Sequence, residues 1–210
     1  MEKIFEDIRD AVINGEQEDV VSLIKGALAQ NIPLGEILNK GLIAGMDVVA
    51  VQFRNAEMYV PDVMISARAM QAGSDLLKPL IASEGEITSK GKIVIGTVKG
   101  DLHDIGKKLV AMMLEGAGFE VIDLGTDVSS EKFVEAFKEI NPDIIGMSAL
   151  LTTTMPAMKE VMDALAEHGY DKKVKVMVGG AVVTADFAKD IKAYYADDAG
   201  SAAELAKTLV

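Results

Sequence analysis

The sequence predicts an α/β protein in two parts: an N-terminal four-helix bundle and a C-terminal Rossmann-like (flavodoxin-like), doubly wound parallel sheet of five strands. Two observations carry this prediction. Residues 1–82 show helical periodicity only. From residue 92 onward, short runs rich in β-branched residues alternate with amphipathic helical stretches. Such alternation is typical of a parallel sheet built from βα units with right-handed crossovers.

The helical part is expected to contain four helices joined by short connections, as in a bundle. Its apolar residues recur at helical spacing in four stretches, 4–13, 20–28, 37–49 and 61–79. The third and fourth stretches are separated by residues 55–60, a break that is rich in large side chains and includes Tyr59. Residues 83–91 are polar, contain two glycines and lack periodicity, so we expect them to link residues 1–82 to a second domain at 92–210.

The second domain is expected to alternate strands with helices. Strands are predicted at 92–98, 120–124, 143–148, 174–178 and, weakly, near 193–195. Helices are predicted at about 105–117, 130–140, 155–168, 184–191 and 202–209. Ser201 has Glu204 three residues after it, and we expect this pair to form the capping box of the last helix.

The composition excludes several classes of function. A net charge of −12 argues against nucleic acid and against anionic membrane surfaces as partners, since both need a basic face. The absence of cysteine excludes disulfides, zinc–thiolate sites, iron–sulfur clusters and thiol nucleophiles. No apolar run approaches about 20 residues, and the acidic, amphipathic N-terminal stretch is unlike a signal peptide. We therefore expect a soluble, cytoplasmic protein.

The loop after the first predicted strand carries the strongest candidate for chemistry. His103 is one of only two histidines in the chain, with Asp101 two residues before it and Gly106 three after it. A neutral imidazole binds a transition metal through one nitrogen while a carboxylate fixes the other, and a glycine leaves room for a bulky group beside the backbone. The alternative is an ordinary polar loop at a helix start, with Asp101 or Asp104 as the N-cap.

Two further strand ends carry unusual residues. The third strand leaves the sheet through small and hydroxylated side chains from Ser148 to Thr154, and the fourth ends at Gly179-Gly180. Each feature alone is compatible with an N-cap region or a simple βα turn. Because parallel strands end at one edge of a sheet, the three loops together outline a slot lined by small residues. A planar-headed ligand with a long tail would fit this slot.

These segments resemble a known family. Asp101-x-His103-x-x-Gly106, Ser148-x-Leu150 and Gly179-Gly180, in this order, are similar to the three signature segments of the cobalamin-binding corrinoid proteins of methyltransferase systems. The related cobalamin module of methionine synthase shares them. The helical part resembles the family too, notably at 59–62 and 66–70, so the resemblance covers nearly the whole chain. The chain departs from the family's common pattern at Lys108 and in its last predicted strand.

The resemblance implies a role for each matching residue. His103 is implied as the lower axial ligand of cobalt in place of the cofactor's own dimethylbenzimidazole, with Asp101 and Thr154 completing a hydrogen-bonded relay. Gly106 would leave room for the corrin ring, and Tyr59 on the helical cap would lie near the methyl group. The other implied cofactor contacts are Asp104, Ile105, Ser148, Leu150, Thr152, Gly179 and Gly180, of which Ser148, Thr152 and the glycines would line the slot for the displaced nucleotide tail.

The implied function is that of a corrinoid methyl carrier. Its cobalt would accept a methyl group from a substrate-specific methyltransferase and pass it to an acceptor methyltransferase, for instance one acting on tetrahydrofolate or a thiol. Methylamines, methanol, betaines and aryl methyl ethers are the implied donors, and an ATP-dependent reductive activase is a further implied partner. Since His103 must bind and release cobalt in each cycle, we expect protonation of the relay to accompany its release.

Other interpretations stay open at this point. A cobalamin-dependent sensor would also join a helical bundle to this domain, although it usually carries an output segment. The small subunit of an adenosylcobalamin mutase uses the same histidine loop but generally lacks the helical cap. A flavodoxin-like domain without a corrinoid is the plainest alternative. The other histidine, His168, ends a predicted helix and is expected to be a surface residue that complements the helix dipole.

Overall fold

A computed structural model describes residues 2–84 and 89–210. The chain divides into two compact units, a helical one that reaches to Ser89 and includes Gly116–Gly118, and an α/β one formed by the rest. The predicted linker 83–91 lies partly outside the described residues. No helix in the described part of the chain is long and apolar enough to span a membrane.

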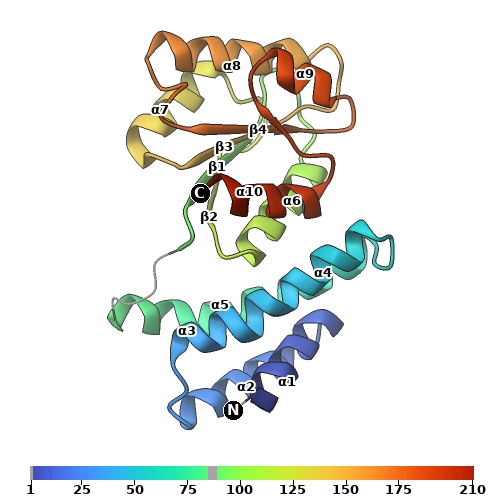
Figure 1. Cartoon of the computed structure of the whole chain (residues 1–210), viewed down its shortest axis with the longest axis vertical. Coiled ribbons are helices and arrows are strands. Elements are labelled where there is room, and N and C mark those ends of the chain that lie inside the picture. Colours follow the sequence, from blue (N-terminus) through green and yellow to red (C-terminus); the bar gives the residue numbers. More distant parts are fainter. Residues whose placement is uncertain (1, 85–88) are drawn as a thin grey trace. The chain divides into compact units, whose positions relative to one another are not determined.

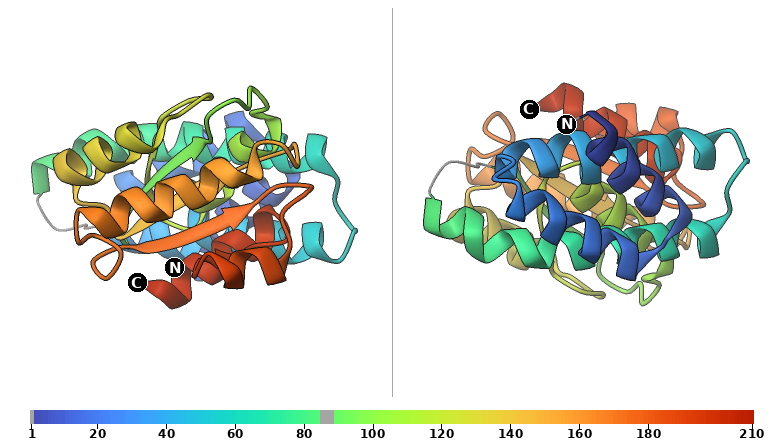
Figure 2. Two further views of the ribbon diagram at one scale, coloured as in Figure 1. Left: turned by 90° about the horizontal axis from the view of Figure 1, so that it is seen from above. Right: turned by 90° about the horizontal axis from the view of Figure 1, so that it is seen from below.

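The helical unit is built from four long helical segments, as predicted. In the right-hand view of Figure 2, α1 and α2 (blue) lie beside α5 (green). Fully buried aliphatic side chains such as Ile8, Ile24, Leu42 and Leu77 form its core. The segments are α1 (Glu2–Asn14), α2 (Gln17–Ala29), the continuous run α3 (Leu34–Glu36), η1 (Ile37–Ile43) and α4 (Ala44–Arg54), and α5 (Val60–Glu84).

The third segment differs from the regular α-helix that its periodicity predicts, because η1 is π-helical. The wider turn buries Gly41, Leu42 and Ile43 in succession. Close packing accompanies it: a Cβ at Gly41 would lie 2.8 Å from a methyl carbon of Ile8 on α1. The predicted end of the fourth helix at Pro79 was also wrong, since α5 continues past this proline. A proline inside a helix removes one backbone hydrogen bond and crowds the carbonyl four residues earlier, and α5 contains Pro79 in spite of this cost.

The α/β unit contains five parallel strands in the order β2-β1-β3-β4-β5. Helices α7, α8 and α9 cover one face of the sheet, and α6 and α10 cover the other (Figure 1). The elements are β1 (Lys92–Thr97), α6 (Ile105–Gly116), β2 (Glu120–Asp123), α7 (Ser130–Ile140), β3 (Ile144–Ser148), α8 (Met155–Glu167), β4 (Lys175–Gly179), α9 (Ala185–Asp190), β5 (Tyr194–Tyr195) and α10 (Ala199–Leu209). The predicted doubly wound sheet is therefore confirmed.

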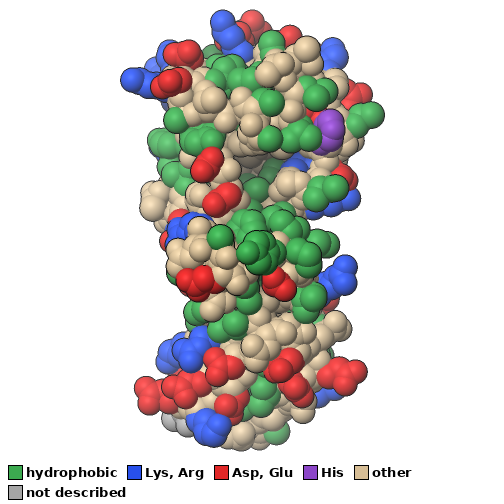
Figure 3. All heavy atoms as spheres, turned by 90° about the vertical axis from the view of Figure 1, so that its right-hand side faces the viewer, with side chains coloured by type: hydrophobic (Ala, Val, Ile, Leu, Met, Phe, Trp, Pro, Cys, Tyr) green, Lys and Arg blue, Asp and Glu red, His purple; other side chains and the backbone are tan. Residues whose placement is uncertain are grey.

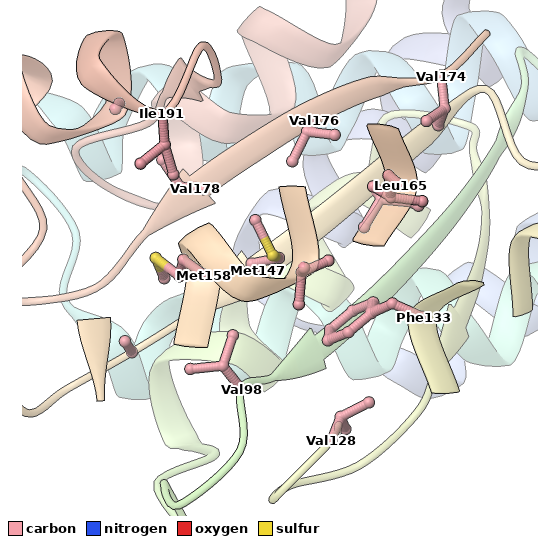
Figure 4. Packing of buried hydrophobic residues seen from close by; sticks show 14 of the residues in the cluster. Val98, Val128, Phe133, Met147, Met158, Leu165, Val174, Val176, Val178 and Ile191 are labelled. Atoms are coloured by element: carbon pink, nitrogen blue, oxygen red, sulfur yellow. The ribbon is translucent and has the colours of Figure 1, made fainter. Parts of the chain in front are cut away.

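The core between the sheet and α7, α8 and α9 is continuous and apolar. Met147 and Val178 from the strands pack against Phe133 of α7 and Met158 of α8 (Figure 4). Phe133 and Met158 are fully buried. This packing fixes the strands whose carboxyl ends carry the candidate site.

One predicted helix start was wrong. Helix α10 begins at Ala199, and Asp198 is its N-cap: the Asp198 carboxylate accepts hydrogen bonds from the backbone N–H and the hydroxyl of Ser201, each at 2.6 Å. Ser201 therefore lies inside the first turn rather than at the cap, and Ser201 and Glu204 do not form the expected capping box. An aspartate is as good an N-cap as a serine, and here the earlier residue has the extended backbone that a cap needs.

Candidate functional site

Strand register brings the predicted site loops together. Thr97 at the end of β1 pairs with Ser148 at the end of β3, and Ser148 pairs with Gly179 at the end of β4. From β1 the chain adds β2 on one side and then β3 on the other, so the strand order reverses between β1 and β3. Open α/β sheets bind ligands at such a point. The loops after β1, β3 and β4 therefore meet at one edge.

The loop after β1 is folded tightly by its own backbone and by Thr97. Gly100 has a φ of +82°, a conformation that favours glycine, and the Asp101 N–H donates to the carbonyl of Val98 at 3.1 Å. The buried hydroxyl of Thr97 donates to the carbonyl of His103 at 2.8 Å. These bonds turn the Asp101 side chain into the protein and leave the His103 side chain at its surface.

Asp101 is completely buried, and both of its carboxylate oxygens accept hydrogen bonds. Its Oδ1 accepts from the His103 backbone N–H at 3.0 Å and lies 2.7 Å from His103 Nδ1. Its Oδ2 accepts from the N–H groups of Leu150 and Leu151, at 2.7 and 3.3 Å, and from the Thr154 hydroxyl at 2.8 Å. One carboxylate thus joins the loop after β1 to the loop after β3.

This environment keeps Asp101 ionised. Burial alone would raise its pKa, but the N–H groups of Leu150 and His103, the His103 side chain and the Thr154 hydroxyl outweigh burial and hold the pKa well below the usual range. Asp101 therefore supplies a fixed negative charge directly behind the imidazole. It does not cap α6, so the alternative interpretation of Asp101 as an N-cap is wrong.

The His103 ring is held from behind and open in front. Its Nδ1 donates to Asp101, which fixes the tautomer and leaves Nε2 as the nitrogen able to bind a metal. The side chain is 52% exposed although its partner is fully buried. This is the geometry of a metal-ligating histidine with a carboxylate behind it.

Large apolar side chains surround this histidine at the surface. Leu102 and Ile105, on either side of it in the chain, are 74% and 77% exposed, and Leu150 and Leu151 on the adjoining loop are also exposed. Figure 3 shows hydrophobic side chains gathered at the surface of the protein. Exposed apolar clusters of this kind mark binding sites, and this one fits a large, mainly apolar group placed over the imidazole.

The structure gives different reasons for Gly106 and for the Gly179-Gly180 pair. A Cβ at Gly106, in the first turn of α6, would meet no atom within 4 Å, so nothing in the fold itself requires a glycine there. A Cβ at Gly180 would lie 2.0 Å from the carbonyl oxygen of Ala149, and one at Gly179 would lie 2.9 Å from that of Ala196. The Gly179-Gly180 pair is thus required by close contacts within the chain, whatever a ligand adds.

The remaining predicted residues lie as follows. Ser148 is partly buried at the end of β3, and Thr152 is exposed. Thr154 is the N-cap residue of α8, yet its hydroxyl bonds Asp101 instead of capping. Asp104 forms an ion pair with Lys108 that lowers the pKa of its carboxyl. Tyr59 is exposed before α5, in the helical unit.

The sequence interpretation missed Thr97 and the whole loop after β2. Within that loop, Asp127 donates its backbone N–H to the Asp101 carbonyl at 3.0 Å, and its carboxylate accepts from the Gly100 N–H at 2.7 Å. The sequence did contain a signal for this loop. Gly125 and Asp127 directly follow the strand that pairs with β1, so they lie at the same edge of the sheet as the His103 loop.

The second histidine is placed as predicted. His168 is the C-cap residue of α8, and its Nδ1 donates to the carbonyl of Ala164 at 2.9 Å, in the last turn of the helix. Its ring stacks on Tyr170 at a centroid distance of 5.9 Å. No group of three or more metal-ligating side chains occurs within residues 2–84 and 89–210. His103 is therefore suited to a metal that brings its other ligands with it.

Comparison with known proteins identifies the group that brings such a metal. A family model described as a B12 binding domain matches residues 91–209, and a second model with the same description matches residues 4–78. The chain belongs to this B12-binding family. Its cofactor is a corrinoid, and the interpretation as a corrinoid-free flavodoxin-like domain was wrong.

Relatives that match over nearly their whole length are also corrinoid proteins. The chain is 46% identical to dimethylamine corrinoid protein 1 of Methanosarcina acetivorans, over 100% of this chain and 98% of that protein. It is 42% identical to a corrinoid protein of Desulfitobacterium hafniense, over 99% of this chain and 97% of that one.

Solved structures confirm the two-part fold. The methanol:cobalamin methyltransferase complex of Methanosarcina barkeri has a chain that matches with a TM-score of 0.88 at 33% identity, over 99% of this chain and 79% of that one. A cobalamin-binding protein of Desulfitobacterium hafniense matches with a TM-score of 0.83 at 30% identity, over 98% of each chain. The predicted helical cap with a Rossmann-like domain is thereby confirmed.

The described residues fit a corrinoid. A corrinoid brings most of the cobalt ligands itself, so a single imidazole from the protein would be sufficient. His103 offers one nitrogen, the surrounding leucines and Ile105 offer apolar contacts, and Gly106 leaves space beside the first turn of α6.

Proposed function

We propose that this protein is a methyl carrier of a corrinoid-dependent methyltransferase system, with His103 as the lower ligand of cobalt. The observation that carries the proposal is the pairing of an exposed imidazole with a fully buried, fully hydrogen-bonded carboxylate. When bound, the corrinoid supplies a cobalt that takes up a methyl group from one enzyme and gives it up to another. The chain itself supplies the ligand, its orientation and the surrounding surface.

Within this function the relay controls the basicity of the ligand. The Asp101 charge holds the proton on Nδ1 of His103, so the lone pair of Nε2 stays directed outward. The Thr154 hydroxyl and the Leu150 and Leu151 N–H groups hold Asp101 in place through its second oxygen. We propose that a proton reaching this relay accompanies release of the histidine from cobalt.

The other predicted cofactor contacts keep their proposed roles. Ser148, Thr152, Gly179 and Gly180 lie at one sheet edge, where they would line a slot for the nucleotide tail. The helical unit would cap the opposite face of the ring, with Tyr59 facing the methyl group. These roles rest on the resemblance and on the placement of the loops.

The proposed partners are a substrate-specific methyltransferase, an acceptor methyltransferase and an ATP-dependent reductive activase. Several relatives at 42–46% identity carry dimethylamine in their names, and a trimethylamine corrinoid protein of Methanosarcina acetivorans is 43% identical. We therefore propose a methylated amine as the first donor to test. Methanol, betaines and aryl methyl ethers are the competing donors.

The ligand is tested by electron paramagnetic resonance of the corrinoid-loaded full chain, poised as Co(II), with and without ¹⁵N-histidine. Because the chain has only two histidines, His168→Ala is a matched control. We expect the axial nitrogen splitting to change with the label in wild type and in His168→Ala, and to show no label dependence in His103→Ala. A label-independent spectrum in corrinoid-loaded wild type would refute His103 as the ligand.

The carrier role is tested separately by transfer. Corrinoid-loaded, reduced protein is mixed with methyltransferases specific for dimethylamine, trimethylamine or methanol, and the cofactor's absorption spectrum reports methylation. Methylation with an amine-specific enzyme and with no other would support the proposed donor class. Methylation by none of them, in protein that shows the histidine splitting, would refute this donor class but not the ligand.

A further inference from the structure

The loop after β2, residues 124–129, supports the His103 loop from the side away from β3. In the sheet β1 lies between β2 and β3, so the loop after β1 has a neighbour on each side. The loop after β2 is tied to β1 by three backbone bonds: Leu124 N–H to the Ile95 carbonyl at 2.8 Å, Thr97 N–H to the Gly125 carbonyl at 3.0 Å, and Val128 N–H to the Thr97 carbonyl at 3.0 Å. It therefore continues the β1–β2 ladder beyond the strands.

Asp127 extends this support to the relay itself. Its backbone N–H donates to the Asp101 carbonyl at 3.0 Å, and its carboxylate Oδ1 accepts from the Gly100 N–H at 2.7 Å. The two bonds hold the peptide group that follows the Asp101 Cα and the peptide group that precedes the Gly100 Cα. They constrain the direction in which the Asp101 side chain, and with it the His103 ring, leaves the backbone.

The backbone conformation of Asp127 indicates that its neighbours hold this residue in place. Its φ is +53°, in the left-handed region that costs an ordinary side chain energy and that Asp, Asn and Gly tolerate best. Such a conformation persists where surrounding bonds determine it, and here the two bonds to the His103 loop do so.

The loop is anchored at its start as well. The Asp123 carboxylate accepts from the Gly125 N–H at 2.8 Å and pairs with Lys107, whose ammonium group is almost completely buried. Lys107 belongs to the first turn of α6, four residues after His103. The loop after β2 thus contacts the start of the segment that carries His103, and Asp123, the last residue of β2, contacts its end.

We propose that Asp127 is a positioning residue for the Asp101–His103 pair, acting from the loop after β2 rather than by contact with the cofactor. The proposal deepens the proposed function and rests on it for the use of His103 as a ligand. The claim that Asp127 controls the position of the His103 imidazole does not depend on the cofactor.

The test therefore uses the cofactor-free full chain. The ¹⁵N resonances of the two imidazoles give the tautomer of each, and His168, bonded to its own helix carbonyl, is the internal reference. Three variants separate the causes: Asp127→Asn keeps an acceptor and tolerates the positive φ, Asp127→Gly keeps the φ but loses the acceptor, and Asn141→Gly changes a residue of similar φ (+49°) at the end of α7, away from the site.

We expect Asp127→Gly to lower the ratio of the Nδ1–H to the Nε2–H tautomer of His103 about fivefold, the effect of weakening one hydrogen bond. Asp127→Asn and Asn141→Gly should leave His103 as in wild type, and His168 should not change in any variant. If Asp127→Gly and Asn141→Gly lower the free energy of unfolding alike while His103 keeps its wild-type tautomer, Asp127 is merely structural and the proposal is refuted. Should Asp127→Gly fail to fold, Asp127→Ser, which shortens the acceptor, is judged by the same criterion.

The outcome is independent of the cobalt ligand. A shift of the His103 tautomer in cofactor-free Asp127→Gly would support the positioning role even if the paramagnetic spectra showed no histidine on cobalt. Conversely, a histidine splitting of equal strength in loaded wild type and Asp127→Gly, with unchanged tautomers, would refute the positioning role and leave the proposed function standing.

Discussion

Removing the Thr154 hydroxyl tests how the relay is held together. Thr154→Val keeps the shape of a buried side chain but deletes the donor that lies 2.8 Å from Asp101 Oδ2. A hydrogen bond to a charged group is worth about 1.5–3 kcal/mol. Because Oδ2 keeps the N–H groups of Leu150 and Leu151, we expect the low end, a loss of about 1.5 kcal/mol in the free energy of unfolding at pH 7.

The pH dependence of this loss has a definite sign. The pKa of Asp101 is depressed in the folded protein, so its interactions stabilise the fold above the ordinary aspartate pKa, and this contribution is lost as pH falls through the folded-state pKa. With one donor fewer, the folded-state pKa of Asp101 in Thr154→Val lies above that of wild type. The stability difference between the two proteins should therefore be constant from pH 7 to about pH 5 and shrink only in stronger acid.

Urea unfolding of wild type, Thr154→Val and Thr154→Ser between pH 3 and 7 measures these differences in the free energy of unfolding. Thr154→Ser keeps the hydroxyl and should stay within about 0.5–1 kcal/mol of wild type, the cost of one methyl group. The same variants, loaded with corrinoid, should show a weaker axial histidine splitting only for Thr154→Val. Equal stability of wild type and Thr154→Val, or a serine variant as unstable as the valine variant, would show that the hydroxyl does not support Asp101.

Three further substitutions probe the site. Gly180→Ala should destabilise the fold by more than about 3 kcal/mol in thermal or urea unfolding, because its Cβ would meet the Ala149 carbonyl at 2.0 Å and the φ is +125°; wild-type stability would contradict the packing described. Gly106→Ala should leave stability equal or higher by up to about 1 kcal/mol, yet weaken corrinoid binding about tenfold in a titration; unchanged affinity would show that no ligand approaches there. Lys107→Met should cost about 2–3 kcal/mol of unfolding free energy, since it leaves the partly buried Asp123 without its partner, and a neutral result would show that the pair is dispensable.

Part of the site could be predicted because its chemistry is local in the chain. Asp101, His103 and Gly106 lie within one short loop, and the choice of a histidine with a carboxylate two residues away already indicates a metal ligand. The hydroxyl of Thr154 came from the resemblance, because nothing in its local sequence sets it apart from Thr152 and Thr153. Only strand register and the burial of Asp101 bring it to 2.8 Å from the carboxylate.

The errors have physical reasons as well. The π-helical turn, the passage of α5 through Pro79 and the Asp198 cap each depend on tertiary packing or on a choice between two equally good local signals. The glycines of the fourth strand end were interpreted as room for a ligand, whereas the structure shows that Gly180 first makes room for Ala149 of the same chain.

Hydrophobic periodicity and short motifs are properties of neighbouring residues, so they were enough to predict the two-part architecture, the parallel sheet and the candidate histidine. The tertiary structure decided which groups hold that histidine. Asp127 reaches the loop through its backbone N–H and its carboxylate, and Thr97 reaches it through its hydroxyl. Leu150 and Leu151 reach Asp101 through their backbone N–H groups. Backbone N–H donors are present at every residue except proline and leave no mark in the sequence, so only the folded sheet could show which of them bond to Asp101.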